Sequence, residues 1–134
     1  MSTGDPVFQL LYLSRLAAGC DFAVVKHIVA VSRRCNPPAG IGGSLLFDGE
    51  RFCQLLEGAE ATVRALMDRI GRDPRHTDLL VLSAAWSQRG RLLPHWRSGY
   101  CDVHQLEGFD GADGLRGQRA LDTFMSVLHG ADME

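Results

Sequence analysis

The sequence lacks an excess of charge of either sign, because 14 Lys and Arg residues stand against 16 Asp and Glu residues in a chain of 134. Domains that bind nucleic acid directly usually carry a basic field that draws them onto the phosphates. The charge balance therefore argues against nucleic acid as a direct partner.

The sequence also lacks any apolar run approaching the roughly 20 residues needed to span a bilayer. The segment 1–7 is polar and shows no charged-then-apolar pattern of the kind that marks a signal peptide. We therefore expect a soluble, cytoplasmic protein with no membrane partner.

Closely spaced cysteine pairs are missing as well. The four cysteines lie far apart without a CxxC motif, which in a cytoplasmic protein favours free thiols over a disulfide framework. Cys101 and His104 supply only half of a metal-ligand set, and the sequence offers no second half. We predict no metal site and expect buried, unreactive thiols at Cys20, Cys35, Cys53 and Cys101.

Regular hydrophobic patterns fill most of the chain, and 46% hydrophobic residues suffice for the core of one domain with a tail. Short apolar runs predict strands, and apolar residues at i, i+3, i+4 and i+7 predict helices. An Asp-Gly pair at 48–49 predicts a hairpin turn. The expected elements are strand 8–13, helix 21–34 with Asp21 as its N-cap, strands 44–47 and 51–57, helix 60–71, strands 79–83 and 96–103, and a helical stripe at 121–128.

This order predicts an α+β fold that is ferredoxin-like, βαββαβ with an extra strand. We expect a five-stranded mixed sheet with two helices on one face, plus a C-terminal helix. The predicted domain covers residues 1–103, and 104–134 would form a linker, glycine-rich at 108–117, and a helical tail. The tail's apolar stripe could form an interface or cover the exposed sheet face, and covering is favoured because such a face needs burying. Its residues are Leu121, Phe124, Met125 and Leu128.

Three polar residues stand at informative places. Alternation along strand 51–57 puts Gln54 on one face with Phe52 and Leu56. If that face is covered by helices, both ends of the Gln54 amide need partners, whereas the alternative is a solvent-facing glutamine. Tyr12 would ordinarily be a core tyrosine, and Asn36 before two prolines could simply end a helix.

Taken together, these residues and their surroundings resemble the BLUF domains, blue-light sensors that bind flavin. The resemblance spans about residues 7–103, and its motifs are specific only in combination. The matching segments are 12–15 (YLSR), 32–36 (SRRCN), 41–49 (IGGSLLFDG), 51–58 (RFCQLLEG), 69–70 (RI) and 72–76 (RDPRH).

The resemblance implies a flavin between the two helices: FAD, with FMN or riboflavin as alternatives. Its implied contacts are Asn36 and Gln54 at the ring edge, Arg69 and Asp73 at the ring or ribityl chain, and Ile28 and Ile41 as apolar walls. Excited flavin is a strong oxidant, and tyrosine is oxidisable with a transferable proton. The implied photocycle moves an electron and a proton from Tyr12 through Gln54 and leaves the Gln54 amide rearranged.

A sensor of this kind is not an enzyme. We find no room for a catalytic output domain in 134 residues, so we expect output through contact with another protein, and a homo-oligomer.

Two positions depart from the family pattern. Ser98 stands where many members carry Met in the expected switch strand, which includes Trp96, and Gly42 stands where many carry Thr. Because Ser98 replaces this methionine, we expect a different route from Gln54 to the strand or a different rate of dark recovery. His76 is expected to be a surface turn residue.

The main alternative is a ferredoxin-like ligand-binding or oligomerisation module without photochemistry, which would leave the three polar residues as coincidence. An acylphosphatase-type enzyme would need an Arg and Asn cradle for phosphate, and no convincing spacing for one is found.

Overall fold

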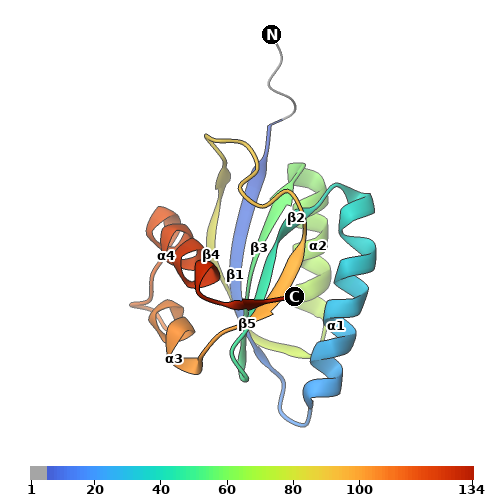
Figure 1. The fold of residues 1–134 in the computed structure, drawn as a ribbon, viewed down its shortest axis with the longest axis vertical. Coiled ribbons are helices and arrows are strands. Elements are labelled where there is room, and N and C mark those ends of the chain that lie inside the picture. The colour runs from blue at the N-terminus through green and yellow to red at the C-terminus, as the bar shows by residue number, and fades with distance from the viewer. Residues whose placement is uncertain (1–5) are drawn as a thin grey trace.

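The computed structural model describes residues 6–134, so the first five residues of the predicted domain lie outside the described part. A central sheet separates two layers of helices (Figure 1). The elements are β1 Phe8–Leu16, α1 Phe22–Cys35, β2 Gly42–Phe47, β3 Arg51–Gly58, α2 Glu60–Arg72, β4 His76–Trp86, β5 Arg97–Tyr100, α3 Val103–Leu106, α4 Gly117–His129 and β6 Asp132–Met133, with short 3₁₀ helices at Pro37–Ala39 and Glu107–Phe109.

The sheet has the strand order β4-β1-β3-β2-β5-β6. Strands β4, β1, β3 and β2 pair antiparallel, and β5 joins β2 in parallel. The expected α+β, ferredoxin-like core is confirmed, but the sheet has six strands and not five. The end of the chain adds β6 to β5, and Gly99 permits this approach because a Cβ there would lie 2.8 Å from the Asp132 carbonyl oxygen.

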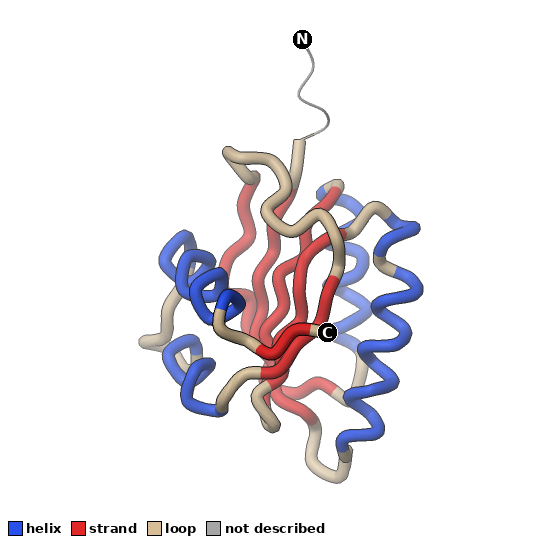
Figure 2. The backbone as a smooth tube through the Cα atoms, in the orientation of Figure 1, coloured by secondary structure: helices blue, strands red, loops and turns tan. Residues whose placement is uncertain are grey.

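Helices α1 and α2 cover one face of the sheet, while α3 and α4 lie on the other (Figure 2). Leu121 and Phe124 of α4 join a core cluster with Leu11, Leu13 and Leu55 from the central strands. The expectation that the C-terminal helix covers the second face is therefore confirmed. No helix within residues 6–134 combines the length and apolar character needed to cross a membrane.

Several predicted boundaries were wrong. Strand β4 has 11 residues where 79–83 was expected, since it pairs along nearly the whole of β1. Strand β5 ends at Tyr100 and not at 103, because Asp102 and Gln105 form a capping box that starts α3.

The four cysteines are free thiols, as expected. Their expected burial holds for Cys53 alone. Cys35 is exposed, since it ends α1 on the outer side, and Cys20 and Cys101 are partly exposed.

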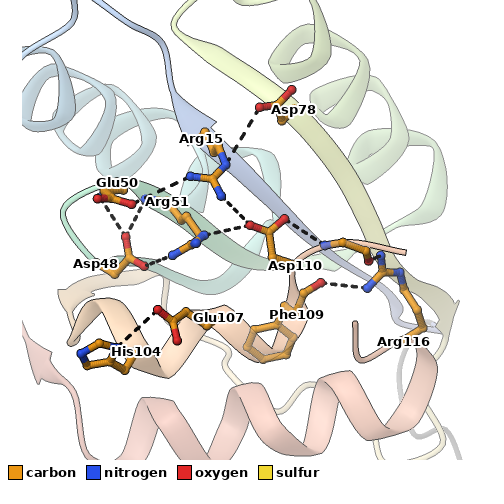
Figure 3. A network of polar contacts seen from close by, with 11 residues as sticks. Arg15, Asp48, Glu50, Arg51, Asp78, His104, Glu107, Phe109, Asp110 and Arg116 are labelled. Carbon is orange, nitrogen blue, oxygen red and sulfur yellow. Dashed lines mark hydrogen bonds and ion pairs between the residues drawn. The ribbon is translucent and has the colours of Figure 1, made fainter. Parts of the chain in front are cut away.

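The glycine-rich segment 108–117 lies against the sheet, with Phe109 fully buried. Asp110 Oδ2 accepts hydrogen bonds from Arg15 Nη2 of β1 at 2.6 Å and from Arg51 Nε of β3 at 3.2 Å (Figure 3). Asp48 also binds the Arg51 side chain, through Nη1 at 3.3 Å. The segment is thus anchored to two central strands by one carboxylate.

Partial burial alone would raise the pKa of Asp110, but the hydrogen bond from Arg51 and the charge of Arg15 outweigh it and hold that pKa below its usual value. A carboxyl group with a lowered pKa in the folded state stabilises the fold above its unfolded pKa, about 3.9, and loses this contribution as the pH falls through the folded value.

We predict that Asp110→Asn lowers the free energy of unfolding at pH 7 by about 1–2 kcal/mol, since two charge-assisted hydrogen bonds are weakened at a partly solvated site. The difference from the wild type should shrink at pH 3. Urea unfolding at both pH values measures it, with Asp113→Asn, an exposed residue of the same segment, as control. An equal loss at both pH values, or in the control, would contradict the assignment.

Candidate functional site

Tyr12 and Gln54 face each other across β1 and β3, where they are direct register partners. Gln54 Nε2 donates to Tyr12 Oη at 2.7 Å, and the two side chains are only 3% and 1% exposed. Gln54 lies on the helix-covered face, between core clusters that contain Phe52 and Leu56. The solvent-facing alternative for Gln54 is therefore wrong.

The other end of the Gln54 amide is also satisfied. Trp96 Nε1 donates to Gln54 Oε1 at 2.9 Å, and Trp96 is 6% exposed. An indole N–H can only donate, so the amide oxygen must face Trp96 and the amide nitrogen must face Tyr12. Trp96 was expected within the switch strand, but it directly precedes β5, and its bond to Gln54 was missed. The signal available in the sequence was that a buried tryptophan usually needs an acceptor.

Burial raises the pKa of Tyr12 well above its usual value of 10, although the hydrogen bond to Gln54 acts in the opposite direction. Tyr12 is therefore a neutral phenol at physiological pH. Such a group carries a proton that must leave if the ring loses an electron.

A cavity of about 290 Å³ opens beside this pair, between α1, α2 and the sheet. Its volume is near the lower end of the usual range for small-molecule sites. The lining residues are Tyr12, Ile28, Val31, Ser32, Asn36, Gln54, Leu66, Arg69, Ile70, Asp73, Arg75 and His76. The lining combines apolar side chains with a small number of polar and charged ones, as is typical of small-molecule sites.

Of the residues expected to contact a cofactor, Ile28, Asn36, Gln54, Arg69 and Asp73 line the cavity. Ile41 does not, because it packs into the core cluster beneath α2 with Phe8, Leu10 and Val63. The residues missed on the two helices follow from helical spacing, since side chains three and four positions apart share a face. On α1 they are Val31 and Ser32, three and four positions after Ile28. On α2 they are Leu66, three positions before Arg69, and Ile70, four positions after Leu66.

Asn36 is the C-cap of α1, and it is followed by two prolines, which have no backbone N–H groups. Its backbone supports the turn, accepting hydrogen bonds from the N–H groups of Ala39 and Ile41 at 3.1 and 3.0 Å. Its side chain makes no capping hydrogen bond in this turn, and the buried Nδ2 has no hydrogen-bond partner within residues 6–134. A buried amide nitrogen that lines a cavity suits a ligand with a carbonyl acceptor, and the edge of a flavin ring provides one.

The end of α2 and the start of β4 contribute three polar side chains to the lining, Asp73, Arg75 and His76. Asp73 accepts from Arg75 Nη2 at 2.6 Å, and this hydrogen bond holds the pKa of Asp73 below its usual value. His76 was expected in a surface turn, but it is a half-buried residue of a strand. It begins β4, its Nδ1 lies 2.8 Å from Ser14 Oγ, and its ring centroid is 4.8 Å from that of Phe52. Burial lowers the pKa of His76.

Ser98 of β5 is 2% exposed and accepts a hydrogen bond from Arg33 Nη2 of α1 at 2.9 Å. This hydrogen bond connects α1, whose C-cap is Asn36, to β5, which directly follows Trp96. Both of these elements contribute to the surroundings of Gln54.

Comparison with protein families gives a match of residues 7–99 to the model described as BLUF, sensors of blue-light using FAD. The chain is 34% identical over 73 residues to the blue light- and temperature-regulated antirepressor BluF of Escherichia coli, covering 54% of this chain and 18% of that protein. It is 32% identical over 96 residues to the photoactivated adenylate cyclase subunit beta of Euglena gracilis, covering 71% of this chain and 11% of that protein. The chain thus spans less than a fifth of the length of these curated relatives.

Among solved structures, the dark state of the BLUF protein BlrB superimposes with a TM-score of 0.69 at 28% identity, covering 94% of each chain. The photo-activated state of BlsA superimposes with a TM-score of 0.75 at 20% identity, covering 91% of this chain and 94% of that one. At that identity BlsA supports the fold alone.

Proposed function

Because the chain belongs to the BLUF family of flavin-binding blue-light sensors, we propose that Tyr12 and Gln54 form its light-driven switch. The observation that carries this proposal is the continuous hydrogen-bonded row from Tyr12 through Gln54 to Trp96 at the edge of the cavity. The match to the BLUF family does not favour the alternative of a ligand-binding or oligomerisation module without photochemistry.

In the proposed binding mode, the flavin ring lies between α1 and α2 with Ile28 as an apolar wall. Asn36 Nδ2 donates to a ring carbonyl, and Gln54 lies at the same edge. Arg69 and Asp73 lie toward the ring or the ribityl chain. When bound, the flavin supplies a light-excited state that can oxidise a neighbouring side chain.

The side chains then account for a switch without net reaction. Loss of an electron would make the Tyr12 phenol strongly acidic. This electron would pass to a bound flavin, and the phenol proton would follow it through the Gln54 amide, so that both can return to Tyr12 without a net reaction. In the resting state Gln54 presents its N–H₂ group to Tyr12 and its oxygen to Trp96. Return of the electron and proton to Tyr12 with the amide reversed would let the Tyr12 hydroxyl donate to Gln54 Oε1.

Reversal of the amide has a consequence for the neighbouring strand. It turns the amide nitrogen toward the Trp96 indole N–H, and two donors cannot bond each other. Trp96 then loses its partner, and β5 begins at the next residue. We propose this as the route from Gln54 to the switch strand, with Ser98 and Arg33 as the following contact.

We propose that the chain acts as a sensor and not as an enzyme, with output through contact with a downstream protein, and that it self-associates. Supporting an output by contact, Val81 and Trp86 of the edge strand β4 are exposed large apolar side chains. The four free thiols support a cytoplasmic location.

We predict FAD as the bound flavin, with FMN as the alternative. The matched family is described by FAD, whereas a solved structure of BlrP1 from Klebsiella pneumoniae contains FMN. Two guanidinium groups at the cavity, Arg69 and Arg75, suit a phosphate-bearing flavin. Chromatography and mass spectrometry of the flavin released from the purified protein identify it, and release of FMN or riboflavin in place of FAD would contradict the prediction.

Gln54→Leu should retain flavin, with a Kd raised about 3–10-fold by loss of one hydrogen bond, and should lose the light-induced red shift. The substitution keeps the volume but removes the amide that rearranges. Light-minus-dark absorption spectra measure the effect, with the exposed Gln118→Leu on α4 as the matched control. A normal red shift in the Gln54 variant would refute the role of this residue.

Tyr12→Phe should bind flavin and give no red shift, since the ring remains but the transferable proton and the hydroxyl are removed. Tyr100→Phe is the matched control, because Tyr100 is the other tyrosine of the chain and does not line the cavity. The same spectra under continuous blue light test both variants. A red shift of wild-type size in Tyr12→Phe would mean that another residue supplies the electron.

A further inference from the structure

The chain between β4 and β5 crosses the end of the sheet and is held there by a buried carboxylate (Figure 1). Glu57 of β3 is fully buried, three residues beyond Gln54. Its Oε1 accepts from Leu93 N at 2.7 Å, and its Oε2 accepts from Leu92 N at 2.9 Å and from Gln9 Nε2 at 2.7 Å. One side chain thus fixes two successive backbone N–H groups of the connection.

The neighbouring residue of the connection binds the same region. Arg91 donates through Nη1 to the Glu57 carbonyl oxygen at 3.2 Å and through Nη2 to the Gly40 carbonyl oxygen at 2.7 Å. The segment 91–93 is therefore held by both the side chain and the backbone of Glu57.

The segment 91–93 is also bonded to strand β2. The Leu93 carbonyl oxygen accepts from Gly43 N at 2.8 Å. A Cβ at Gly42 would overlap this oxygen and lie 3.1 Å from the Pro94 carbonyl oxygen. Gly42 is therefore required for space, and larger residues there would push the segment away from β2.

The held segment is close to Trp96 in sequence. Pro94 and His95 separate Leu93 from Trp96, so three Cα steps can span at most about 11 Å. Pro94 further restricts the backbone. Fixing Leu93 against β2 therefore limits where the Trp96 indole can lie, and it lies with its N–H on Gln54 Oε1.

We propose that Glu57 and Gly42 position the switch by holding 91–94 against the sheet, so that Trp96 keeps the Gln54 amide in its resting orientation. Both are positioning residues that act through Trp96. The proposal rests on the proposed role of Gln54. It gives a function to the buried carboxylate of Glu57, which takes no part in the photochemistry itself.

The first test follows the Trp96 indole N–H in the dark, independent of photochemistry. Trp86→Phe leaves Trp96 as the single tryptophan of the chain, and ¹⁵N NMR of the flavin-loaded protein measures its hydrogen exchange. In this background, Glu57→Gln and Gly42→Ala should each speed exchange of the indole N–H by tenfold or more. Glu57→Gln keeps the volume but leaves one N–H without an acceptor.

Matched controls are available for both changes. Gly71→Ala introduces a Cβ that meets no atom within 4 Å, and Glu107→Gln alters an exposed carboxylate. Neither should change the exchange rate. If Glu57→Gln fails to fold, Gly42→Ala decides, because the three atoms nearest to the added Cβ all belong to the connection. Exchange at the wild-type rate in Gly42→Ala would overturn the proposal.

The second test measures recovery in the dark after illumination. Glu57→Gln should change the recovery rate at least threefold, in the same direction as Trp96→Phe, and should add nothing in the Trp96→Phe background. An equal effect of Glu57→Gln with and without Trp96 would show that Glu57 does not act through this residue. Absence of any red shift in the wild type would instead refute the proposed function and leave the indole exchange as the test of positioning.

Discussion

A glutamine amide buried beneath two helices must have both of its ends satisfied, and the site is organised around this requirement. Trp96 can only donate, so it determines which end of Gln54 is the oxygen, and Tyr12 receives the other end. The orientation of the Gln54 amide is thus set by Tyr12 of β1 and by Trp96, which directly precedes β5. A switch needs such a group, because an amide has two orientations of similar shape and opposite hydrogen-bonding character.

Local patterns were enough to predict most of the elements and the residues that share a face with Gln54, whereas the covering of that face by helices was seen only in the structure. Alternation along β3 grouped Gln54 with Phe52 and Leu56, and the Asp-Gly pair predicted the hairpin that brings β2 beside β3. The combination of Tyr12, Asn36 and Gln54 then indicated the family. The strand pattern and the hairpin succeeded because each depends on neighbours in sequence or on spacing within one element, whereas the family inference depended on motifs from several elements taken together.

The errors concern contacts between distant segments. Ser14 and Phe52 contact the half-buried His76 from two other strands, and Ile41 packs into the core cluster beneath α2. Strand β6 exists because Gly99 leaves space for it. The hydrophobic periodicity of one segment does not indicate which distant residues will contact it. The departures at Gly42 and Ser98 were visible in the sequence, but their meaning required the structure, which places Leu93 against one and Arg33 on the other.

Arg15 and Arg51 are direct register partners on β1 and β3, three residues from Tyr12 and Gln54 respectively. Like charges directly opposite each other destabilise a strand pair, and Asp110 lies between these two from the far face of the sheet. A slip of one residue between the strands would displace Tyr12 from Gln54 by about 3.4 Å and would also pull one arginine off the shared carboxylate. The alignment of the proposed switch pair is therefore maintained from the face of the sheet opposite the cavity.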